Sequence, residues 1–334
     1  MKRKLNDDNE NVTKRSLSSS STALRSEILV RLMNYTPLPI EINKVIDSYL
    51  SLYYLFSNAN KNKKWYKMNV EDKKWLPIPS ELPVTDFAVA TSQDLCMFTQ
   101  INNDSCLVIE DVHSYYIPAK YNFRIYRLSS DHTWIFLGRW ALNDDCNGIT
   151  VHNHVYLIGG SMVMHEPLSV SYLACVRKID LSNQQGKFVS FMNQSRSRMS
   201  SVAYHNSIYV FGGYSTYGEL HTCERYDMDE DKWIAIANMP SSHCGGQAVV
   251  WNEVTGEIVV MGGYDTFQYH VPSNTWKTLK NWELPHFLIN PNNGFIAYMI
   301  CHYTQVVIIS QREPSGCWYR SVHDNDWISL PFPK

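Results

Sequence analysis

Apolar and polar residues alternate differently in two parts of this chain. From about residue 53 onward, apolar runs of the length of β-strands are separated by clusters of Gly, Pro, Asn and Asp. Helical spacing is confined to residues 26–52, in two groups separated by Thr36-Pro37: Ile28, Leu29, Leu32 and Met33, then Ile42, Val45, Ile46 and Tyr49. The pattern predicts two short helices followed by a long all-β region.

Residues 1–25 have neither pattern. They are polar and carry the basic pairs Lys2-Arg3 and Lys14-Arg15 before a serine run at residues 18–21. Such a segment buries too little apolar surface to offset the entropy of ordering, so we expect a disordered basic tail. Two basic clusters across a spacer are also typical of a nuclear import signal, and a merely solvated tail would look the same.

A repeat organises the β region. Three apolar runs each end in a glycine pair, and the pairs recur at intervals of about 50 residues: Val155-Tyr156-Leu157-Ile158-Gly159-Gly160, Ile208-Tyr209-Val210-Phe211-Gly212-Gly213 and Ile258-Val259-Val260-Met261-Gly262-Gly263. In three further repeats the positions that correspond to the glycine pair are occupied by other residues: Phe56-Ser57, Phe98-Thr99 and Ile309-Ser310.

A second marker supports the same units. A tyrosine is followed, after a polar turn, by a tryptophan: Tyr66 and Trp75, Tyr126 and Trp134, Tyr226 and Trp233, Tyr269 and Trp276, Tyr319 and Trp327. A degenerate copy has Ile179 and Phe188 in these slots. The markers together predict six units of four strands each.

These motifs resemble the kelch-repeat family over residues 53–334. The resemblance implies an all-β, six-bladed kelch-type β-propeller, preceded by a short α-helical segment and the disordered tail. In such a fold the glycines allow close backbone approach, and the Tyr and Trp side chains lie between neighbouring blades. The first blade needs a partner strand from residues 40–52, which conflicts with the helix predicted there.

The second predicted helix has a weaker resemblance. The stretch Leu38-Pro39-Ile40-Glu41-Ile42, leading to Ile46-Asp47-Ser48-Tyr49-Leu50, resembles the opening helix of an F-box, a module that docks an adaptor of cullin-type ubiquitin ligases. A helical plug that packs on the neighbouring domain would fit the same residues.

Composition narrows the classes of partner. The formal charge is −2, from 30 basic and 32 acidic side chains, so we expect neither nucleic acid nor an anionic membrane as partner. No apolar run reaches the length of a membrane span, and no secretory signal is recognisable. The eight cysteines have no zinc-like spacing, so reduced thiols and a cytoplasmic or nuclear location are expected.

Two clusters imitate metal sites. His152 and His154 lie two apart on a strand, but the repeat places His152-Asn153 on the slots of His205-Asn206, which predicts a turn. Asp227, Asp229 and Asp231 resemble the start of a calcium loop, yet Lys232 stands where glycine is required. We therefore predict no metal and no cofactor.

Kelch propellers bind partners with the loops at one end of their central channel. The resemblance places seven residues of this chain there, just after the glycines or at the start of each first strand: Ser161, Tyr214, Tyr264, Asn143, Arg196, Arg198 and His243. Tyr and Arg dominate interface energetics, although the two tyrosines could equally cover blade edges.

The favoured function is therefore a non-catalytic module that binds a protein or peptide, with the N-terminal helices as a link to a cullin-type ligase adaptor. One alternative is an enzyme, since some six-bladed kelch proteins epimerise sugar acids and others are copper-radical oxidases. An epimerase needs an acid–base pair and an arginine clamp, and the predicted slots supply at most one arginine. Another alternative is an actin-associated scaffold.

Overall fold

The computed structural model describes the chain in part. The longest described stretches are residues 145–165, 168–262 and 265–280. The other described residues are 53–58, 64–69, 74–77, 79, 96–102, 105–112, 122–128, 133–141, 282, 297–302, 305–310, 316–321 and 326–330. The predicted tail (1–25) and the predicted helical segment (26–52) lie outside this part. No helix occurs within it.

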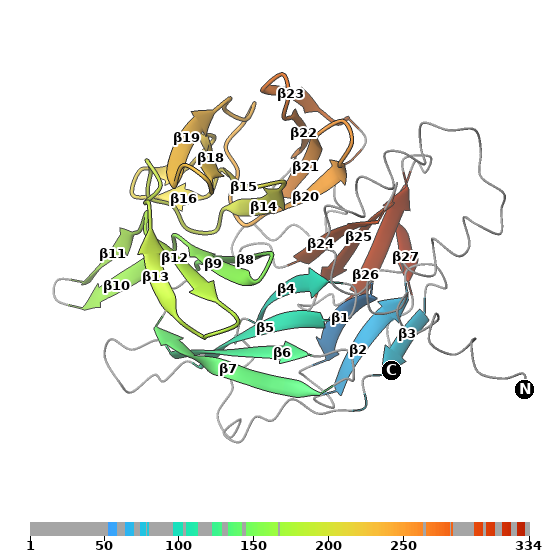
Figure 1. Ribbon diagram of the computed structural model, residues 1–334. Helices are drawn as coiled ribbons and strands as arrows, with labels where there is room; N and C mark the ends of the chain where they lie inside the picture. Colours follow the sequence, from blue (N-terminus) through green and yellow to red (C-terminus); the bar gives the residue numbers. More distant parts are fainter. Residues whose placement is uncertain are drawn as a thin grey trace, which may run out of the picture. The chain divides into compact units, whose positions relative to one another are not determined.

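Six antiparallel sheets follow one another along the chain (Figure 1). The first has three strands, β1 (Tyr53–Asn58), β2 (Lys64–Asn69) and β3 (Lys74–Pro77). The second consists of β4 (Cys96–Asn102), β5 (Ser105–Val112), β6 (Asn122–Leu128) and β7 (Trp134–Ala141). The third consists of β8 (Asn147–Val151), β9 (His154–Ile158), β12 (Val176–Asp180) and β13 (Gly186–Val189).

The remaining three sheets also have four strands. The fourth consists of β14 (Ser200–Tyr204), β15 (Ser207–Phe211), β18 (Cys223–Asp227) and β19 (Lys232–Ile236). The fifth consists of β20 (Gln247–Asn252), β21 (Glu257–Gly262), β22 (Asp265–His270) and β23 (Thr275–Thr278). The sixth consists of β24 (Ala297–His302), β25 (Gln305–Ser310), β26 (Gly316–Ser321) and β27 (Ile328–Leu330).

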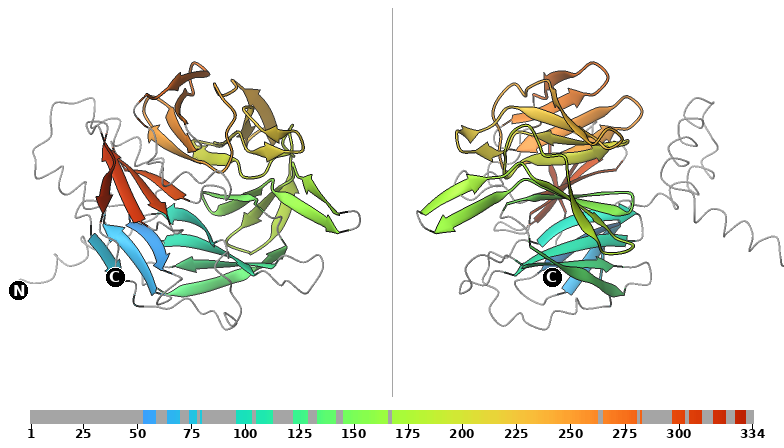
Figure 2. Two further views of the ribbon diagram at one scale, coloured as in Figure 1. Left: turned by 180° about the vertical axis from the view of Figure 1, so that it is seen from behind. Right: turned by 60° about the vertical axis from the view of Figure 1, so that its left-hand side comes forward.

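Two small hairpins are inserted between the second and third strands of a sheet. They are β10 (Ser161–His165) with β11 (Leu168–Tyr172), and β16 (Tyr214–Ser215) with β17 (Gly218–Glu219). The β10–β11 hairpin projects away from the sheets (Figure 2).

Neighbouring sheets contact each other through their first strands. β4 contacts β8, β8 contacts β14, β14 contacts β20, and β20 contacts β24. All the sheets belong to one compact unit, Ser51–Lys334. An all-β fold of successive antiparallel blades is thereby confirmed, as in a kelch propeller.

The glycine-ended apolar runs form buried second strands. β9 and β15 are buried at nearly every position, because each lies inside a sheet that is covered on both faces. Ile158 and Val210 lie in one hydrophobic cluster that joins the third and fourth sheets, while Phe211 and Val260 lie in a second that joins the fourth and fifth. A single sheet could not bury both faces, so the core lies between sheets.

The tyrosine–tryptophan marker is confirmed in two sheets. Tyr226 is directly opposite Trp233 across β18 and β19, and Tyr269 is opposite Trp276 across β22 and β23. The indole of Trp233 donates to the carbonyl of Ser190 at 2.9 Å, at the end of the preceding sheet. The indole of Trp276 likewise donates to the carbonyl of Ala237 at 2.8 Å. Each tryptophan thus forms a hydrogen bond with the segment that leads from the preceding sheet into its own.

The second and third sheets depart from the prediction. The register of β6 and β7 places Phe136 opposite Tyr126, and the two ring centroids are 5.4 Å apart. Trp134 is paired instead with Leu128. Phe188, expected between sheets, is 57% exposed, with the Arg177 guanidinium 5.0 Å from its ring.

Three further slots differ from the expected alignment. Phe98-Thr99 belong to β4, a first strand, because β5 is the second strand of that sheet. In the first sheet Trp75 is opposite Met68 and not Tyr66. In the last sheet Trp327 directly precedes β27, whose Ile328 is opposite Tyr319.

The glycine pairs mark a close approach of backbone. A Cβ added to Gly212 would lie 2.3 Å from the carbonyl oxygen of His243, and one added to Gly159 would lie 2.3 Å from that of Arg196. Both glycines have φ near +60°, which other residues rarely adopt. The segment that enters the next sheet passes directly over each pair, so glycine is required here.

Candidate partner-binding face

The predicted binding residues come from loops at the same end of the strands. In an antiparallel sheet the first strand begins where the second ends. Accordingly Ser200 at the start of β14 is paired with Phe211 at the end of β15, and Asn147 with Ile158 in the preceding sheet. Residues that follow the glycine pairs therefore lie beside residues that open the first strands.

The structure divides the seven predicted residues into three groups. Tyr214 and Arg198 are exposed, and an isolated bridge between Ser197 and Tyr214 brings them together. Ser161, Arg196 and His243 are buried and belong to the scaffold. Asn143 and Tyr264 lie outside the described residues.

Arg198 has an unusual backbone conformation. Its φ is +50°, and the equivalent residues two positions before β8 and β20, Asp145 and Gly245, have φ of +52° and +71°. The three are joined in series, since the Arg198 amide donates to the Asp145 carbonyl at 3.2 Å and the Gly245 amide donates to the Arg198 carbonyl at 2.8 Å. Consecutive sheets thus repeat one left-handed residue at the base of the face.

The Arg198 side chain reaches back to the preceding sheet. Its Nε lies 2.9 Å from Oδ2 of Asp145, and the two side chains are 49% and 25% exposed. Tyr172, at the end of β11, contacts Tyr214 with ring centroids 5.7 Å apart. Burial and the neighbouring Tyr214 raise the pKa of Tyr172, so this phenol stays neutral at physiological pH.

The prediction missed the aromatic side chain that is the most exposed among the described residues. Tyr217, in the turn between β16 and β17, is 95% exposed, and its amide donates to the Ser215 hydroxyl. Glu219 is paired with Tyr214 across this hairpin and accepts a hydrogen bond from the Cys244 thiol at 3.2 Å. The six residues Asp145, Tyr172, Arg198, Tyr214, Tyr217 and Glu219 are called the tyrosine face below. The pair Tyr214 and Tyr217, three residues apart after Gly213, was visible in the sequence.

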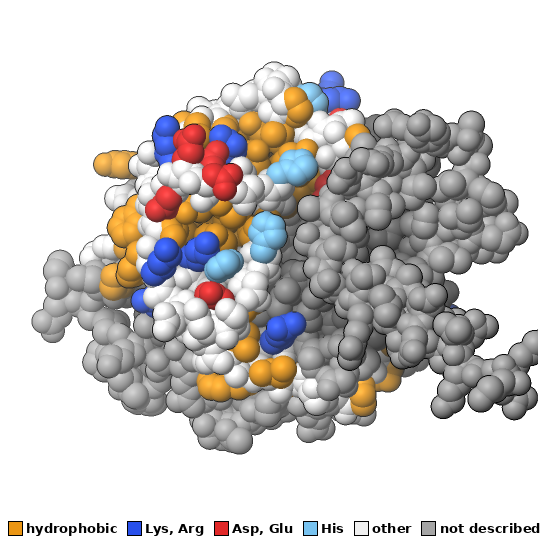
Figure 3. Space-filling model, viewed as in Figure 1, with side chains coloured by type: hydrophobic (Ala, Val, Ile, Leu, Met, Phe, Trp, Pro, Cys, Tyr) orange, Lys and Arg blue, Asp and Glu red, His pale blue; other side chains and the backbone are white. Residues whose placement is uncertain are grey.

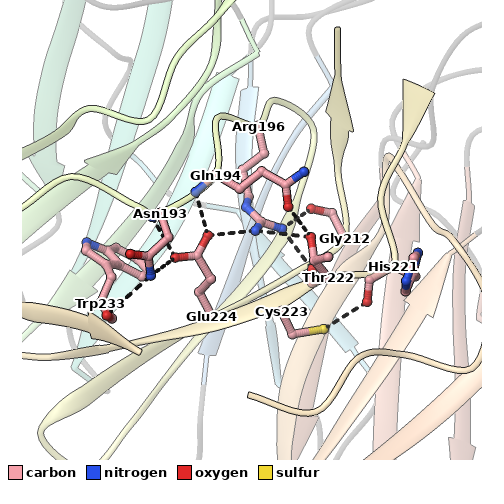
Figure 4. Close-up of polar contacts among 9 residues, drawn as sticks. All are labelled: Asn193, Gln194, Arg196, Gly212, His221, Thr222, Cys223, Glu224 and Trp233. Carbon is pink, nitrogen blue, oxygen red and sulfur yellow. Dashed lines mark hydrogen bonds and ion pairs between the residues drawn. The ribbon is translucent and has the colours of Figure 1, made fainter. Parts of the chain in front are cut away.

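Arg196 anchors the loops below this face (Figure 4). Its guanidinium is fully buried, donates to the carbonyl oxygens of Gly212 and Thr222 at 2.7 and 2.8 Å, and pairs with Glu224 at 2.8 Å. These two carbonyls bracket the loop that carries the β16–β17 hairpin. One side chain therefore fixes both ends of that loop.

Glu224 extends the same network to the preceding sheet. Its Oε2 accepts hydrogen bonds from the backbone and side-chain nitrogens of Asn193, and its Oε1 accepts one from the Gln194 amide. Both residues belong to the segment that crosses from β13 to β14. The Arg196–Glu224 network thus ties this crossing segment to β18 beneath the tyrosine face.

One buried pair has the geometry of a nucleophile and a base. Ser200 Oγ lies 3.1 Å from His243 Nε2. Both residues are almost completely buried, so no substrate can reach the hydroxyl. The pair packs the scaffold instead, since a Cβ added to Gly246 would lie 1.9 Å from His243 Nε2.

The two clusters that resemble metal sites in the sequence include turns of the chain, as predicted. His152 and His205 have φ of +53° and +50° in the tight turns after β8 and β14. Asp229 and Glu230 are in the β18–β19 turn, and acidic and basic side chains lie together over these strands (Figure 3). Among the described residues, no three His, Cys, Asp or Glu side chains lie close enough to hold a metal ion.

Within the described part of the chain, no helix has the length and apolar character needed to cross a bilayer.

Comparison with known proteins gives a consistent set of similarities. Residues 195–240 match the model of the Kelch motif. Kelch repeat protein C2 of vaccinia virus (strain Western Reserve) is 30% identical over 190 residues, which are 55% of this chain and 35% of the viral protein. Kelch-like protein 38 of Rattus norvegicus is 27% identical over 139 residues, which are 39% of this chain and 23% of the rat protein.

A third relative comes from an amoeba. A kelch repeat-containing protein of Dictyostelium discoideum is 31% identical over 151 residues, which are 41% of this chain and 21% of that protein. The chain thus spans about a third or less of the length of each of these relatives. The motif match falls on β14, β15, β18 and β19, the sheet that carries the tyrosine face.

Proposed function

We propose that this chain, which is a kelch-repeat protein, is a non-catalytic module that binds a protein partner through the tyrosine face. The observation that carries the proposal is Tyr217, which is 95% exposed on a loop whose two ends are fixed by the buried Arg196. A loop whose backbone is held in place before binding loses little conformational entropy when its aromatic side chain is buried in a partner. The kelch-repeat relatives support a role in protein interaction.

The experiment is affinity capture from cells with cross-linking and mass spectrometry, using the full-length chain. Tyr217→Ala and Tyr214→Ala each remove an exposed ring of the face. Asp229→Asn is the control, because Asp229 is exposed in a turn at the opposite end of the strands. We expect a set of proteins that is lost with both face variants and retained by the control. If all three variants retain the same proteins, the proposed face is wrong.

We further propose that the segment resembling an F-box links the captured partner to a cullin-type ubiquitin ligase in the cytoplasm or nucleus. This proposal rests on the sequence of residues 38–50 alone. The full-length chain with Leu38→Ala and Pro39→Ala should lose a ligase adaptor and its cullin while retaining the proteins that depend on Tyr217. If no adaptor or cullin is captured by the unaltered chain, the ligase role is excluded and the binding role is unaffected.

A further inference from the structure

The charges of the tyrosine face do not cancel. Arg198 is its single basic residue, and Asp145 already neutralises it at 2.9 Å. An incoming carboxylate would have to approach the guanidinium beside the Asp145 carboxylate, and like charges so close repel. Arg198 is therefore a poor site for an acidic segment while Asp145 is present.

Among the residues that the structure describes, no basic side chain pairs with Glu219. Its hydrogen-bond donor is the thiol of Cys244 at 3.2 Å. Burial and the nearby carboxylate raise the pKa of this thiol to about 12, so it donates a hydrogen bond but stays neutral. The face keeps one uncompensated negative charge at the base of the hairpin that carries Tyr217.

Tyrosine residues neighbour Glu219 in the hairpin and across it. Glu219 is paired with Tyr214 across the β16–β17 hairpin, Tyr214 contacts Tyr172, and Tyr217 extends into solvent two residues before Glu219. Faces of tyrosine rings attract ammonium and guanidinium groups, and a neighbouring carboxylate adds to the attraction. The tyrosine rings and the Glu219 carboxylate therefore both favour a positively charged side chain.

We propose that the tyrosine face recognises a protein segment through a lysine or arginine side chain, which lies against Tyr214 and Tyr217 and pairs with Glu219. This inference rests on the proposed function and adds the chemistry of the partner. Asp145 has a separate role in it: by neutralising Arg198, it selects against acidic segments.

The test uses the full-length chain and synthetic fluorescent peptides that differ at one central position, occupied by Lys, Arg, Gln, Glu or Asp, with Leu, Ser and Tyr varied around it. Binding is measured by fluorescence polarisation at low ionic strength. A cation near exposed rings and one carboxylate should give Lys and Arg peptides an advantage of about tenfold over Glu and Asp peptides.

Four variants locate the effect. Glu219→Gln should abolish most of the preference, and Glu219→Lys should invert it. Asp145→Asn should raise the affinity for Glu and Asp peptides, because it frees Arg198. Asp229→Asn removes an equal charge at the opposite end and should change nothing. Thermal melting of each variant checks that the fold is intact.

The outcomes separate this inference from the proposed function. A preference for Glu or Asp, or a Lys preference that survives Glu219→Gln, overturns the inference. If the central residue makes no difference while Tyr217→Ala weakens every peptide, the inference fails and the proposed function stands. If Tyr217→Ala and Tyr214→Ala leave all binding unchanged, or if no peptide binds, both the inference and the proposed function fail for linear segments.

Discussion

Arg198 holds a left-handed backbone conformation that costs free energy for any residue with a Cβ. Gly245, its equivalent in the next sheet, has the same sign of φ without that cost. We predict that Arg198→Gly is more stable than Arg198→Ala by about 1 kcal/mol, because glycine relieves the strain and both variants lose the same exposed ion pair. Urea denaturation of the two variants measures the difference, and an Ala variant as stable as the Gly variant would contradict it.

Asp231 and Asn274 are equivalent residues that form equivalent bonds. Asp231 accepts from the Tyr226 hydroxyl at 2.6 Å and the Ser190 amide at 2.9 Å, while Asn274 accepts from the Tyr269 hydroxyl and the Ala237 amide, both at 2.8 Å. The hydrogen bonds from Tyr226 and from the Ser190 amide lower the pKa of Asp231. An amide therefore serves the same structural role without titrating.

This equivalence predicts a change in pH dependence. A carboxylate whose pKa is lowered on folding stabilises the fold above its unfolded pKa, near 4, and loses that contribution as the pH falls through the lower folded value. In Asp231→Asn, stability near pH 7 should change little and should fall less steeply below about pH 4. Melting temperatures from pH 7 to pH 2 test this, with Asp229→Asn as control. A steeper acid loss in the variant would show that the carboxylate is not stabilising.

The sequence could not distinguish Arg196 from Arg198. Both lie just before a first strand and carry the same charge, but their side chains go to opposite places: Arg196 is fully buried with Glu224, and Arg198 is exposed with Asp145. The difference depends on the left-handed backbone at Arg198, which nothing in the residue type indicates. Tyr217 was missed for a related reason, because loop exposure follows from the supporting contacts and not from spacing.

At the scale of elements, two of the three glycines in the loop between β15 and β18 have opposite surroundings. Gly212 has φ of +60° and lies under the His243 carbonyl, whereas Gly218 has φ of +102° with nothing within 4 Å of an added Cβ. We predict that Gly212→Ala destabilises by about 3 kcal/mol or more, since strain and a backbone clash add, and Gly218→Ala by about 1 kcal/mol from strain alone. Chemical denaturation of the two variants tests the prediction, and equal losses would show that the crossing segment moves aside freely.

The strands themselves were largely predictable. Apolar runs that end in glycine pairs gave the second strands correctly, because a strand buried on both faces is continuously apolar. The tyrosine–tryptophan register held in the β18–β19 and β22–β23 hairpins and failed in the β6–β7 hairpin, where Phe136 is opposite Tyr126. The register of a hairpin is set by its turn, and spacing alone did not show that the β6–β7 turn pairs Trp134 with Leu128. The sequence also hid which strand of the second sheet holds Phe98.

At the scale of the whole molecule, the sheets are held together by what passes between them. Tyr226 and Trp233 lie in the same hydrophobic cluster as Ile158 of the preceding sheet, and the indole of Trp233 bonds the segment that crosses from it. Each sheet is completed by its neighbour, as in other repeat proteins. Damage to a crossing segment should therefore affect two sheets.

The Arg196–Glu224 pair offers the sharpest test of this coupling. Removing one partner of a buried ion pair leaves an uncompensated charge, so we predict that Arg196→Met costs about 3–5 kcal/mol of stability. Arg198→Met, two residues away, removes an exposed pair and should cost less than about 1 kcal/mol.

Hydrogen exchange shows which part of the fold is destabilised. Faster exchange should extend from Gln194 in the crossing segment to Thr222 before β18 in Arg196→Met and be absent in Arg198→Met, because only the buried guanidinium bonds both ends of the loop beneath the tyrosine face. Exchange that rises equally throughout the described strands would mean that Arg196 stabilises the fold in general and does not position the face.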